Sequence, residues 1–516
     1  GLTIGSNAGG FSGGVKVVGT QTFSGSNLTG GTLTLQSDTG KIDVNAALSS
    51  PINTTLSSNA NDITFGASGA LTATLKAVTL TAGTGGAIVG NNGATTNVTA
   101  NSLTATANKG IGSANKLTSN VTQLTANNIG GGAAGNVNLE NAQSLNLGAS
   151  GVVSNTAAGG SLGVTITGND QDLTISNTVS AAGGGAINLS AARHIIFAQG
   201  AGVTGVSTTG TATLSADVNG ASNAVRGSIQ GQAATATDVA AGTLNMTSGA
   251  GIGAANALET AVTNLSFTNN VSGAVNITNT SGAITLSASS NTGGGATTLS
   301  TSNTLSLDDG GTGTALNGGS GALSLAAGAG GILAVNNANA FAELATTGAT
   351  VTLNTSGAIG SGAKPIQIAD NTNTAQQVVT IGTVTQPSAV FVNGLGTLTL
   401  GAITTNNGAV TVNAADRLAM TGVLNSGNAT VALNANTAAG AATFFDMLAG
   451  SSITTTNATG SAVTIKVNTA GGGTGGATLR SINVNSPGTI TVDTSAAGGN
   501  TSGGSITMAG GTLNAG

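Results

Sequence analysis

The chain has 516 residues, of which 85 are glycine, and it contains no cysteine, tryptophan or tyrosine. Only 5% of the residues are charged and the net charge is −5, which favours neither nucleic-acid binding nor direct insertion into a membrane. The lack of cysteine excludes a disulfide framework and a thiolate metal site. With 2% aromatic residues, a narrow core of stacked repeats suits this composition better than large globular domains do.

Pairs of apolar residues, separated by one residue that is usually polar, recur along the chain and predict very short strands. Residues two apart in a strand point to the same face, so both members of a pair face one core. Segments rich in Gly, Asn and Ser lie between the pairs and predict tight corners. In chain order the pairs are Leu33/Leu35, Ile42/Val44, Ile63/Phe65, Val164/Ile166, Leu173/Ile175, Ile187/Leu189, Ile195/Phe197, Leu265/Phe267, Val275/Ile277, Ile284/Leu286, Thr297/Leu299, Leu305/Leu307, Leu398/Leu400, Val410/Val412, Leu418/Met420, Val431/Leu433, Ile482/Val484, Ile490/Val492 and Ile506/Met508.

This spacing predicts an all-β fold, a single continuous parallel β-solenoid over residues 1–516. Two or three strands would close one coil of roughly 20–30 residues. A regular Asn-Gly or Asp-Gly hairpin signal is missing from the sequence, which disfavours antiparallel pairing. The rival interpretations are a disordered Gly/Ser/Asn-rich chain and a cross-β stack. The regular apolar pairs disfavour the first, and the irregular corners disfavour the second.

A longer repeat lies over the short one. Residues 110–117 (GIGSANKL) match residues 251–258 (GIGAANAL), and a weaker third copy begins at residues 358–365. The copies differ in length only at Gly/Asn corners, which a solenoid tolerates because a corner can bulge outward.

The repeat resembles those of giant bacterial surface proteins. The module GIGSANKLTSNVTQLTANN, with following strands that end in SLNLG or AITLS, is similar to the repeats of filamentous-haemagglutinin-like and autotransporter-like adhesins. Residues 498–511 (GGNTSGGSITMAGG) resemble their loop-and-strand unit. The resemblance implies a right-handed parallel β-helix, secretion and a role at the cell surface. The chain departs from these proteins in having no secretion signal and no outer-membrane barrel, which would lie outside it.

The titratable residues give few candidates for a chemical site. His194 alternates with the Ile195/Phe197 pair, so we expect it to face solvent. Asp170/Asp172 and Asp308/Asp309 could each hold Ca²⁺ or simply stabilise turns, and the sequence leaves both interpretations open.

The sequence gives no support for catalysis. A carbohydrate-cleaving β-helix needs clustered carboxylates, whereas the acidic residues are scattered and the four arginines, Arg193, Arg226, Arg417 and Arg480, are far apart in sequence. We therefore predict no enzyme activity and assign no catalytic, cofactor-binding or metal-binding residue. Residues 444–448 (FFDML) break the alternation, which indicates core packing, with a short helical insertion or a contact patch as alternatives.

Ice binding is a further alternative because of Thr-rich strings such as residues 104–106 and 452–456. We do not expect these strings to recur at one coil period, as a flat ice-binding face would require.

The sequence therefore predicts an extracellular structural protein, a stalk or fibre subunit at a bacterial cell surface, with carbohydrate binding or cleavage as the alternative. Both ends look like ordinary repeat material, so we expect a processed chain or an excised segment that continues into more of the same polypeptide or into the next subunit of a fibre. Other expected partners are host or environmental surfaces.

Overall fold

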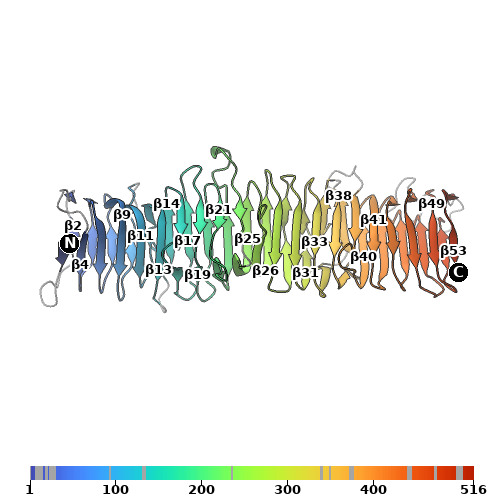
Figure 1. Cartoon of the computed structure of the whole chain (residues 1–516), viewed down its shortest axis with the longest axis horizontal. Coiled ribbons are helices and arrows are strands. Elements are labelled where there is room, and N and C mark those ends of the chain that lie inside the picture. The colour runs from blue at the N-terminus through green and yellow to red at the C-terminus, as the bar shows by residue number, and fades with distance from the viewer. Residues whose placement is uncertain are drawn as a thin grey trace. The chain divides into compact units, whose positions relative to one another are not determined.

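A computed structural model describes the backbone of β1 (Leu2–Gly5), β2 (Val15–Val17) and β3 (Gln21–Thr22). It then describes residues 31–91, 95–130, 135–233, 236–336, 341–347, 350–370, 377–437, 444–469, 474–495 and 504–515. In these ranges short strands alternate with corners, and a 3-10 helix, η2 (Gly220–Ser222), lies in one corner (Figure 1). The chain divides into two units, Gly1–Val262 and Thr263–Gly516.

The strands of the first unit are all paired in parallel. Its early strands are β4 (Thr32–Ser37), β5 (Ile42–Val44), β6 (Ala47–Ser49), β7 (Asn53–Ser58), β8 (Ile63–Phe65), β9 (Ala70–Ala82), β10 (Ile88–Val89), β11 (Val98–Ala107), β12 (Leu117–Asn120) and β13 (Gln123–Asn128). They are followed by β14 (Val137–Asn141), β15 (Leu145–Leu147), β16 (Val153–Asn155), β17 (Leu162–Ile166), β18 (Leu173–Ile175), β19 (Val179–Ala181), β20 (Ile187–Ser190), β21 (Ile195–Phe197), β22 (Val206–Thr208), β23 (Thr211–Ser215), β24 (Ile229–Gln230), β25 (Val239–Ser248) and β26 (Leu258–Asn269), which extends past Val262.

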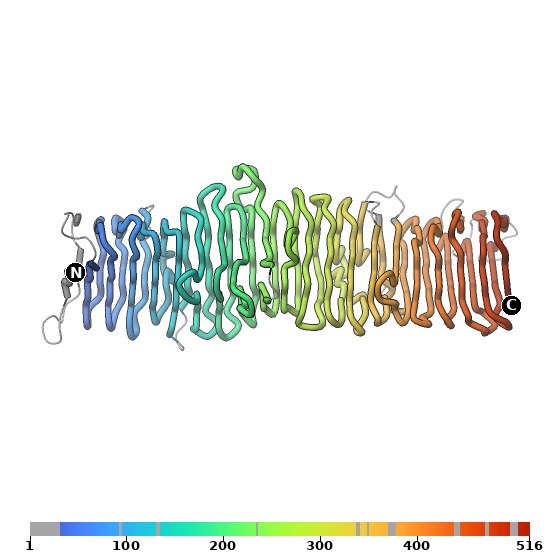
Figure 2. The backbone as a smooth tube through the Cα atoms, viewed as in Figure 1, coloured from blue at the N-terminus to red at the C-terminus, as the bar shows by residue number. Residues whose placement is uncertain are grey.

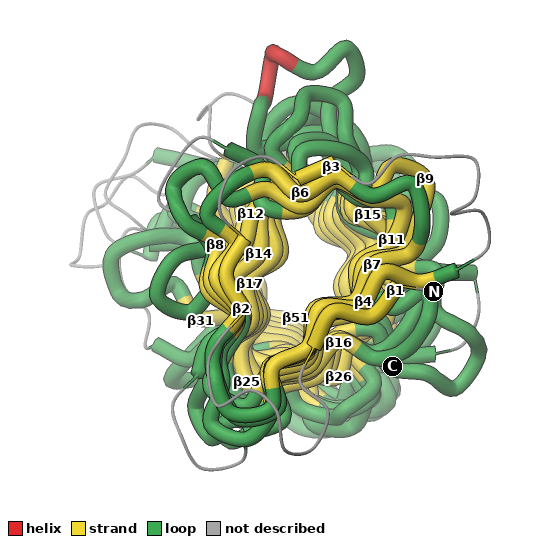
Figure 3. The backbone as a smooth tube through the Cα atoms, turned by 90° about the vertical axis from the view of Figure 1, so that its left-hand side faces the viewer, coloured by secondary structure: helices red, strands yellow, loops and turns green. Residues whose placement is uncertain are grey.

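Each coil in the middle of this unit contains three strands. β14, β17, β20 and β23 pair in succession along one face, β15, β18, β21 and β24 along the second, and β16, β19, β22 and β25 along the third. Val137, Leu162 and Ile187 lie beside one another although 25 residues separate each from the next. The coil length and the parallel pairing predicted from the sequence are therefore confirmed (Figures 2 and 3).

The second unit repeats this plan. Its strands are β27 (Val275–Asn279), β28 (Ile284–Ser287), β29 (Ser289–Asn291), β30 (Thr297–Thr301), β31 (Thr304–Asp308), β32 (Leu316–Asn317), β33 (Leu323–Ala326), β34 (Gly331–Ala334), β35 (Leu344–Thr346), β36 (Val351–Asn354), β37 (Ala358–Ile359), β38 (Ile366–Asp370) and β39 (Gln377–Ile381). They are followed by β40 (Ala389–Gly394), β41 (Leu398–Thr404), β42 (Ala409–Ala414), β43 (Leu418–Met420), β44 (Val423–Asn425), β45 (Val431–Ala435), β46 (Phe445–Met447), β47 (Ser452–Thr455), β48 (Val463–Val467), β49 (Ala477–Leu479), β50 (Ser481–Val484), β51 (Ile490–Asp493), β52 (Ile506–Met508) and β53 (Leu513–Ala515). Each of the units is a parallel β-solenoid.

Most of the predicted apolar pairs form the core. From Leu33/Leu35 to Ile482/Val484 both members of each pair are buried, and the residue between them is usually half-exposed. Ile284 and Leu286, for example, are 1% and 0% exposed, with the half-buried Thr285 between them.

The prediction is wrong for the last two pairs. Ile490 and Val492 are half-buried, while Ile506 and Met508 are 51% and 44% exposed. The physical reason is that, among the described strands, β51 pairs only with β48, and β52 only with β49, so neither strand has a coil on its other side.

Alternation also fails at β43, where Ala419 is as fully buried as Leu418 and Met420. Arg417 lies on the same outward face as Ala419 and forms a 2.8 Å ion pair with Asp446, which is the register partner of Ala419. This pair shields Ala419 from solvent.

Within residues 444–448, Phe445–Met447 form the strand β46, so the alternative of a helical insertion is wrong. Phe445 and Met447 of β46 are buried, whereas Phe444 and Leu448 are 45% and 37% exposed. The core-packing interpretation is confirmed, because Phe445 stacks on Leu418 and Met447 on Met420.

The Thr-x-Thr string of residues 104–106 aligns with Thr79 and Thr81 on one side but with Thr125 and Asn127 on the other, so it does not recur regularly, as expected, although single threonines do form a row. Thr34, Thr55, Thr79, Thr104 and Thr125 are register partners on the face formed by β4, β7, β9, β11 and β13. The neighbouring row, two residues further along, reads Gln36, Ser57, Thr81, Thr106 and Asn127. Only one of the two rows is uniform, so the face carries a single regular line of hydroxyl groups.

Burying a charge in this core should be far more costly than placing one on its surface. We expect Ile284→Asp to lower the free energy of unfolding by about 3–5 kcal/mol, because its carboxylate would be buried without a partner. Chemical denaturation followed by circular dichroism measures this change. The matched control is Thr285→Asp, whose side chain lies between Asn264 and Ser306 on the outward face, and we expect it to change stability by less than about 0.5 kcal/mol. A larger loss for Thr285→Asp than for Ile284→Asp would contradict the register.

Candidate functional site

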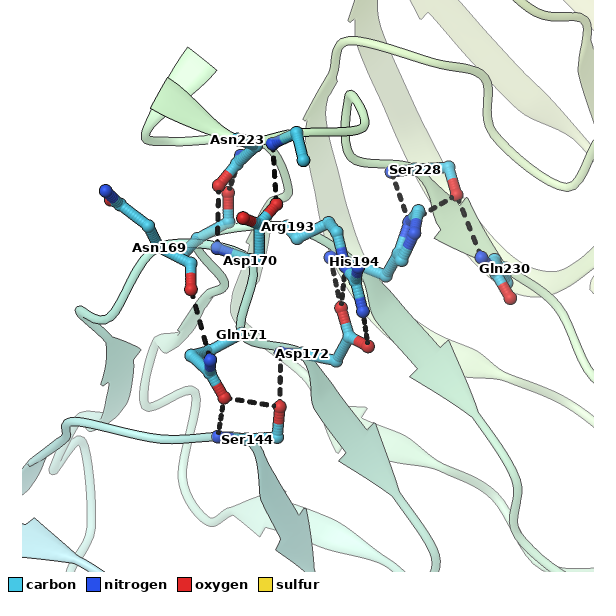
Figure 4. Close-up of polar contacts among 12 residues, drawn as sticks. Ser144, Asn169, Asp170, Gln171, Asp172, Arg193, His194, Asn223, Ser228 and Gln230 are labelled. Carbon is cyan, nitrogen blue, oxygen red and sulfur yellow. Dashed lines mark hydrogen bonds and ion pairs between the residues drawn. The ribbon is translucent and has the colours of Figure 1, made fainter. Parts of the chain in front are cut away.

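An insertion at residues 216–228, between β23 and β24, carries a cluster of polar contacts in the first unit. It contains η2 and projects outward from the neighbouring coils (Figures 1 and 3). Three of the residues singled out from the sequence, Asp170, Asp172 and His194, lie beside it (Figure 4). The cluster is therefore the candidate functional site of the first unit.

Asp217 anchors the insertion from within. Its side chain is 2% exposed and forms an ion pair with Arg226, whose Nε lies 2.6 Å from Oδ2. Its Oδ1 accepts hydrogen bonds from Asn223 Nδ2 at 3.0 Å and from the Gly227 N–H at 2.9 Å. The carboxylate of Asp217 thus joins the beginning of the insertion to its later residues, Asn223, Arg226 and Gly227.

Asp170 docks the insertion onto the preceding coils. Its N–H donates to Asn223 Oδ1 at 3.0 Å, and its Oδ1 accepts the Ala224 N–H at 2.7 Å. With a φ of 56°, Asp170 is in the left-handed region, where Asp is among the better tolerated residues. These contacts show the turn-stabilising role that the sequence left open.

Asp172 points to a different partner, Arg193. Arg193 Nε and Nη2 lie 2.8 and 2.7 Å from the two carboxylate oxygens, and the His194 N–H donates to Oδ1 at 3.1 Å. Burial by itself would raise the pKa of Asp172, but the hydrogen bonds from Arg193 and His194 outweigh it and lower the pKa below its ordinary value. Asp170 and Asp172 therefore stabilise separate contacts and do not converge on a common point.

His194 is half-buried, so the expectation that it faces solvent is only partly correct. Its Nδ1 accepts the Ser228 N–H at 3.0 Å and lies 2.9 Å from Ser228 Oγ. Burial lowers the pKa of His194 below its ordinary value. A nucleophilic Ser–His pair needs a group that orients the ring, whereas Asp172 binds the backbone N–H of His194. The contact fits a coil-to-coil bond, since Ile195 and Ile229 are register partners.

In the second unit, Asp308 and Asp309 stabilise a corner. Asp308 Oδ1 accepts the Gly310 N–H at 2.9 Å, and Asp309 Oδ1 accepts the Gly311 N–H at 2.9 Å. Asn336 Nδ2 donates to both carboxylates. Among the residues that the structure describes, no group of three or more His, Cys, Asp or Glu side chains is placed to hold a metal ion.

Three of the four arginines, Arg193, Arg417 and Arg480, hold neighbouring coils together, whereas Arg226 acts within the insertion. Arg193, Arg226 and Arg417 form ion pairs with aspartates, and Arg480 Nε donates to the Met447 carbonyl at 2.9 Å. The partners Asp172 and Asp446 lie 21 and 29 residues away from their arginines, which is about one coil. Sequence reasoning missed these pairs, although the coil period was the signal that could have found them.

A polar groove of about 290 Å³ lies on the outward side of β14, β17, β20 and β23. Asn138, Gly163, Asn188 and Thr213 are register partners along it. Its lining carries hydroxyl and amide groups but no charged side chain: Ser113, Asn136, Val137, Asn138, Ser161, Gly163, Thr165, Asn188, Leu189, Ser190, Thr213 and Ser215. Such a surface can hydrogen-bond to an uncharged, hydroxyl-rich ligand.

Gly163 opens this groove without being required by the fold. A Cβ on this residue would meet nothing closer than Asn138 Oδ1 and the Val137 carbonyl, both at 3.8 Å. Glycine inside a strand weakens it, and it often marks a place where a ligand approaches closely. The space that a side chain at Gly163 would fill, between Asn138 and Asn188, can therefore accept part of a ligand.

In the described part of the chain, no helix is long and apolar enough to cross a membrane. No protein-family model, curated protein or solved structure matches the chain.

Proposed function

We propose that the chain is an extracellular structural protein, a stalk or fibre segment of a bacterial surface protein, and that it has no catalytic activity. The observation that carries the proposal is the coil-to-coil ladder of parallel strands, which continues through the described coils of each unit. A ladder of this kind resists extension, because each inner coil is hydrogen-bonded to the coil before it and to the coil after it. The resemblance of the repeats to surface adhesins agrees with this role.

The polar side chains support the same proposal, because they are used to join coils. Asn128 Nδ2 donates to Asn155 Oδ1 at 2.8 Å, and Asn269 Nδ2 to Asn291 Oδ1 at 2.8 Å. These four amides are buried, and each bonded pair spans one coil. Stacked amides of this type stabilise a fibre and perform no chemistry.

Surface exposure on the producing cell tests the localisation. We expect antibodies raised against the folded chain to label intact bacteria that produce it, and brief protease treatment of intact cells to remove the label. Immunogold electron microscopy makes the measurement, with an antibody to a cytoplasmic protein as control. Label that is found only after the cells are permeabilised would contradict the proposal.

The partner that we propose is a further β-coil of the same construction. Among the described strands, β51, β52 and β53 each pair on one side only, and Ile506, Met508 and Leu513 are 44–51% exposed. A parallel strand with inward apolar residues would satisfy both the free backbone groups and these side chains. A second copy of the chain or an adjoining segment can supply that coil.

Self-association of the purified chain tests this partner. We expect concentration-dependent oligomers in light scattering, and we expect the triple variant Ile506→Asn, Met508→Asn and Leu513→Asn to reduce them, because an apolar surface is lost. The control is Val384→Asn, which removes an 86% exposed apolar side chain elsewhere in the same unit. A wild-type chain that stays monomeric at high concentration would refute stacking between copies.

A second candidate function is the binding of a neutral glycan in the groove at Gly163. The observation that favours it is the gap in the row Asn138, Gly163, Asn188, which no packing requirement explains. Amide and hydroxyl groups on both sides of the gap match the donors and acceptors of sugar hydroxyls. The groove carries no charged group to recognise an acidic glycan.

Filling the gap tests this function. We expect the wild-type chain to bind neutral oligosaccharides on a glycan array, and Gly163→Val to bind them at least about tenfold more weakly. The variant should fold, because its Cβ meets no atom within 3.8 Å. Gly200→Val is the matched control, since a Cβ there meets nothing within 4 Å and Gly200 lies outside the groove. Equal binding by Gly163→Val, or none by the wild-type chain, would exclude a glycan site in the groove.

A further inference from the structure

Three fully buried polar residues, Asn97, Asp238 and Glu343, each stand directly before a strand of the solenoid. Asn97 precedes β11, Asp238 precedes β25 and Glu343 precedes β35, and each is 0% exposed. Asn97 and Asp238 occupy the same place in the long repeat, 14 residues before Ile111 and Ile252. Glu343 lies 16 residues before Ile359, in the weaker third copy.

The three side chains do the same work, which is to accept an N–H from the next coil. Asn97 Oδ1 accepts the Thr118 N–H at 3.1 Å, and Asp238 Oδ2 accepts the Glu259 N–H at 3.1 Å. Glu343 Oε2 accepts the Gln367 N–H at 2.6 Å. Because the neutral amide of Asn97 is sufficient, the position requires a hydrogen-bond acceptor and no charge.

Among the residues that the structure describes, no cationic side chain pairs with Asp238. Gln199, on the corner after β21, donates from Nε2 to Oδ1 at 2.9 Å, and the uncharged Gln232 lies on the corner after β24. The facing titratable group is Glu259 of β26, a second carboxyl that hydrogen-bonds to Asp238. Gln199 Oε1 and Glu259 Oε2 are buried without a hydrogen-bond partner. Two carboxyl groups in such contact cannot both be ionised.

Glu343 is in a similar position in the second unit. Its Oε1 is buried without a hydrogen-bond partner. The charged group that acts on it from the preceding coil is Asp309, which has the same sign. On the following coil, Lys364 donates to the Val335 carbonyl at 2.6 Å instead. Ionised Glu343 would therefore be a buried charge next to another negative group.

These surroundings favour the protonated form of both carboxyls at pH values below about 7. Burial raises the pKa of Asp238 to about 7, and repulsion from Glu259 adds to the effect. Burial likewise raises the pKa of Glu343 to about 7, with a contribution from Asp309. Burial also raises the pKa of Glu259.

We propose that Asp238 and Glu343 are pH-sensitive clasps between coils, which hold the next coil while they carry a proton and loosen it when they lose the proton. At these positions the C=O of the neutral carboxyl group accepts the N–H that the amide C=O of Asn97 accepts in its own copy of the repeat. The ionised form would place an unpaired negative charge inside the solenoid and favour opening of the coil that exposes it to water.

The direction of the pH effect follows from proton linkage. Each group has a higher pKa in the folded than in the opened state, so the folded state binds more protons. The stabilisation is complete below the ordinary carboxyl pKa of about 4 and is lost as the pH rises through 7. For a folded pKa of about 7, the opening equilibrium constant rises roughly 100-fold between pH 5 and pH 8.

Hydrogen exchange measured by mass spectrometry tests the proposal within one molecule. Protection factors, corrected for intrinsic exchange rates, are compared at pH 5 and pH 8 for peptides that contain Glu259, Gln367 and Thr118. We expect protection to fall by up to roughly 100-fold with rising pH at Glu259 and Gln367, and to stay within about threefold at Thr118, which is bound by neutral Asn97. An equal pH dependence at all three, or none at Glu259 and Gln367, would overturn the proposal.

Isosteric variants provide the second arm. We expect Asp238→Asn to remove the pH dependence at Glu259 only, and Glu343→Gln to remove it at Gln367 only. The amide that Asp238→Asn introduces can be accommodated, because the Gln199 amide can turn its unpartnered Oε1 toward the new NH₂ group. Asp416→Asn is the control for a half-buried surface carboxyl and should leave both pH profiles unchanged. Profiles that persist in the isosteric variants would show that other groups cause them, and the wild-type comparison with Thr118 stands even if a variant does not fold.

Discussion

Backbone hydrogen bonding between successive coils is the constraint on which the rest of this structure depends. A coil of about 25 residues has no interior of its own, so Val137 gains a core only when Leu162 and Ile187 stack beside it. The same ladder aligns side chains that are distant in sequence, and it turns the outward positions into rows. The buried core and the rows of outward side chains therefore both follow from the parallel pairing of successive coils, and the corners are the segments that join the strands.

The corners carry most of the variation, and they also hold most of the polar contacts. At the insertion of residues 216–228, Asp217 and Asp170 supply acceptors for backbone N–H groups that no strand can satisfy. Asp172 and Arg193 then fix the adjoining coil with two short hydrogen bonds. Asp, Arg and His are residue types found in catalytic sites, but here their hydrogen bonds hold the insertion and the adjoining coils in place.

The sequence predicted those features that depend on local periodicity. Alternation within pairs such as Ile284/Leu286 identifies the inward face, and the pair spacing identifies the coil length, because both are properties of one short segment. Contacts between coils depend on register, which the corners set. The distance from Asp172 to Arg193 is 21 residues, close to the coil period, but from His194 to Ser228 it is 34, because the insertion lengthens that coil, so the period could have predicted only the first pair. The row of five threonines was missed because it also depends on the register between coils.

The internal repeat separates what the fold requires from what an individual coil adds. At one equivalent position Asn97 and Asp238 make the same bond to the next coil, and Glu343 makes it in the third copy with a longer side chain. The amide of Asn97 already supplies the hydrogen-bond acceptor that the ladder requires. The carboxyl groups of Asp238 and Glu343 add a property that the ladder does not require, because they can lose a proton. Ion pairs at the surface, such as Lys41–Asp43, contribute little to stability because water screens them. A solenoid can therefore respond to its surroundings mainly through the few titratable groups in its interior, where a change of charge acts directly on the contact between coils.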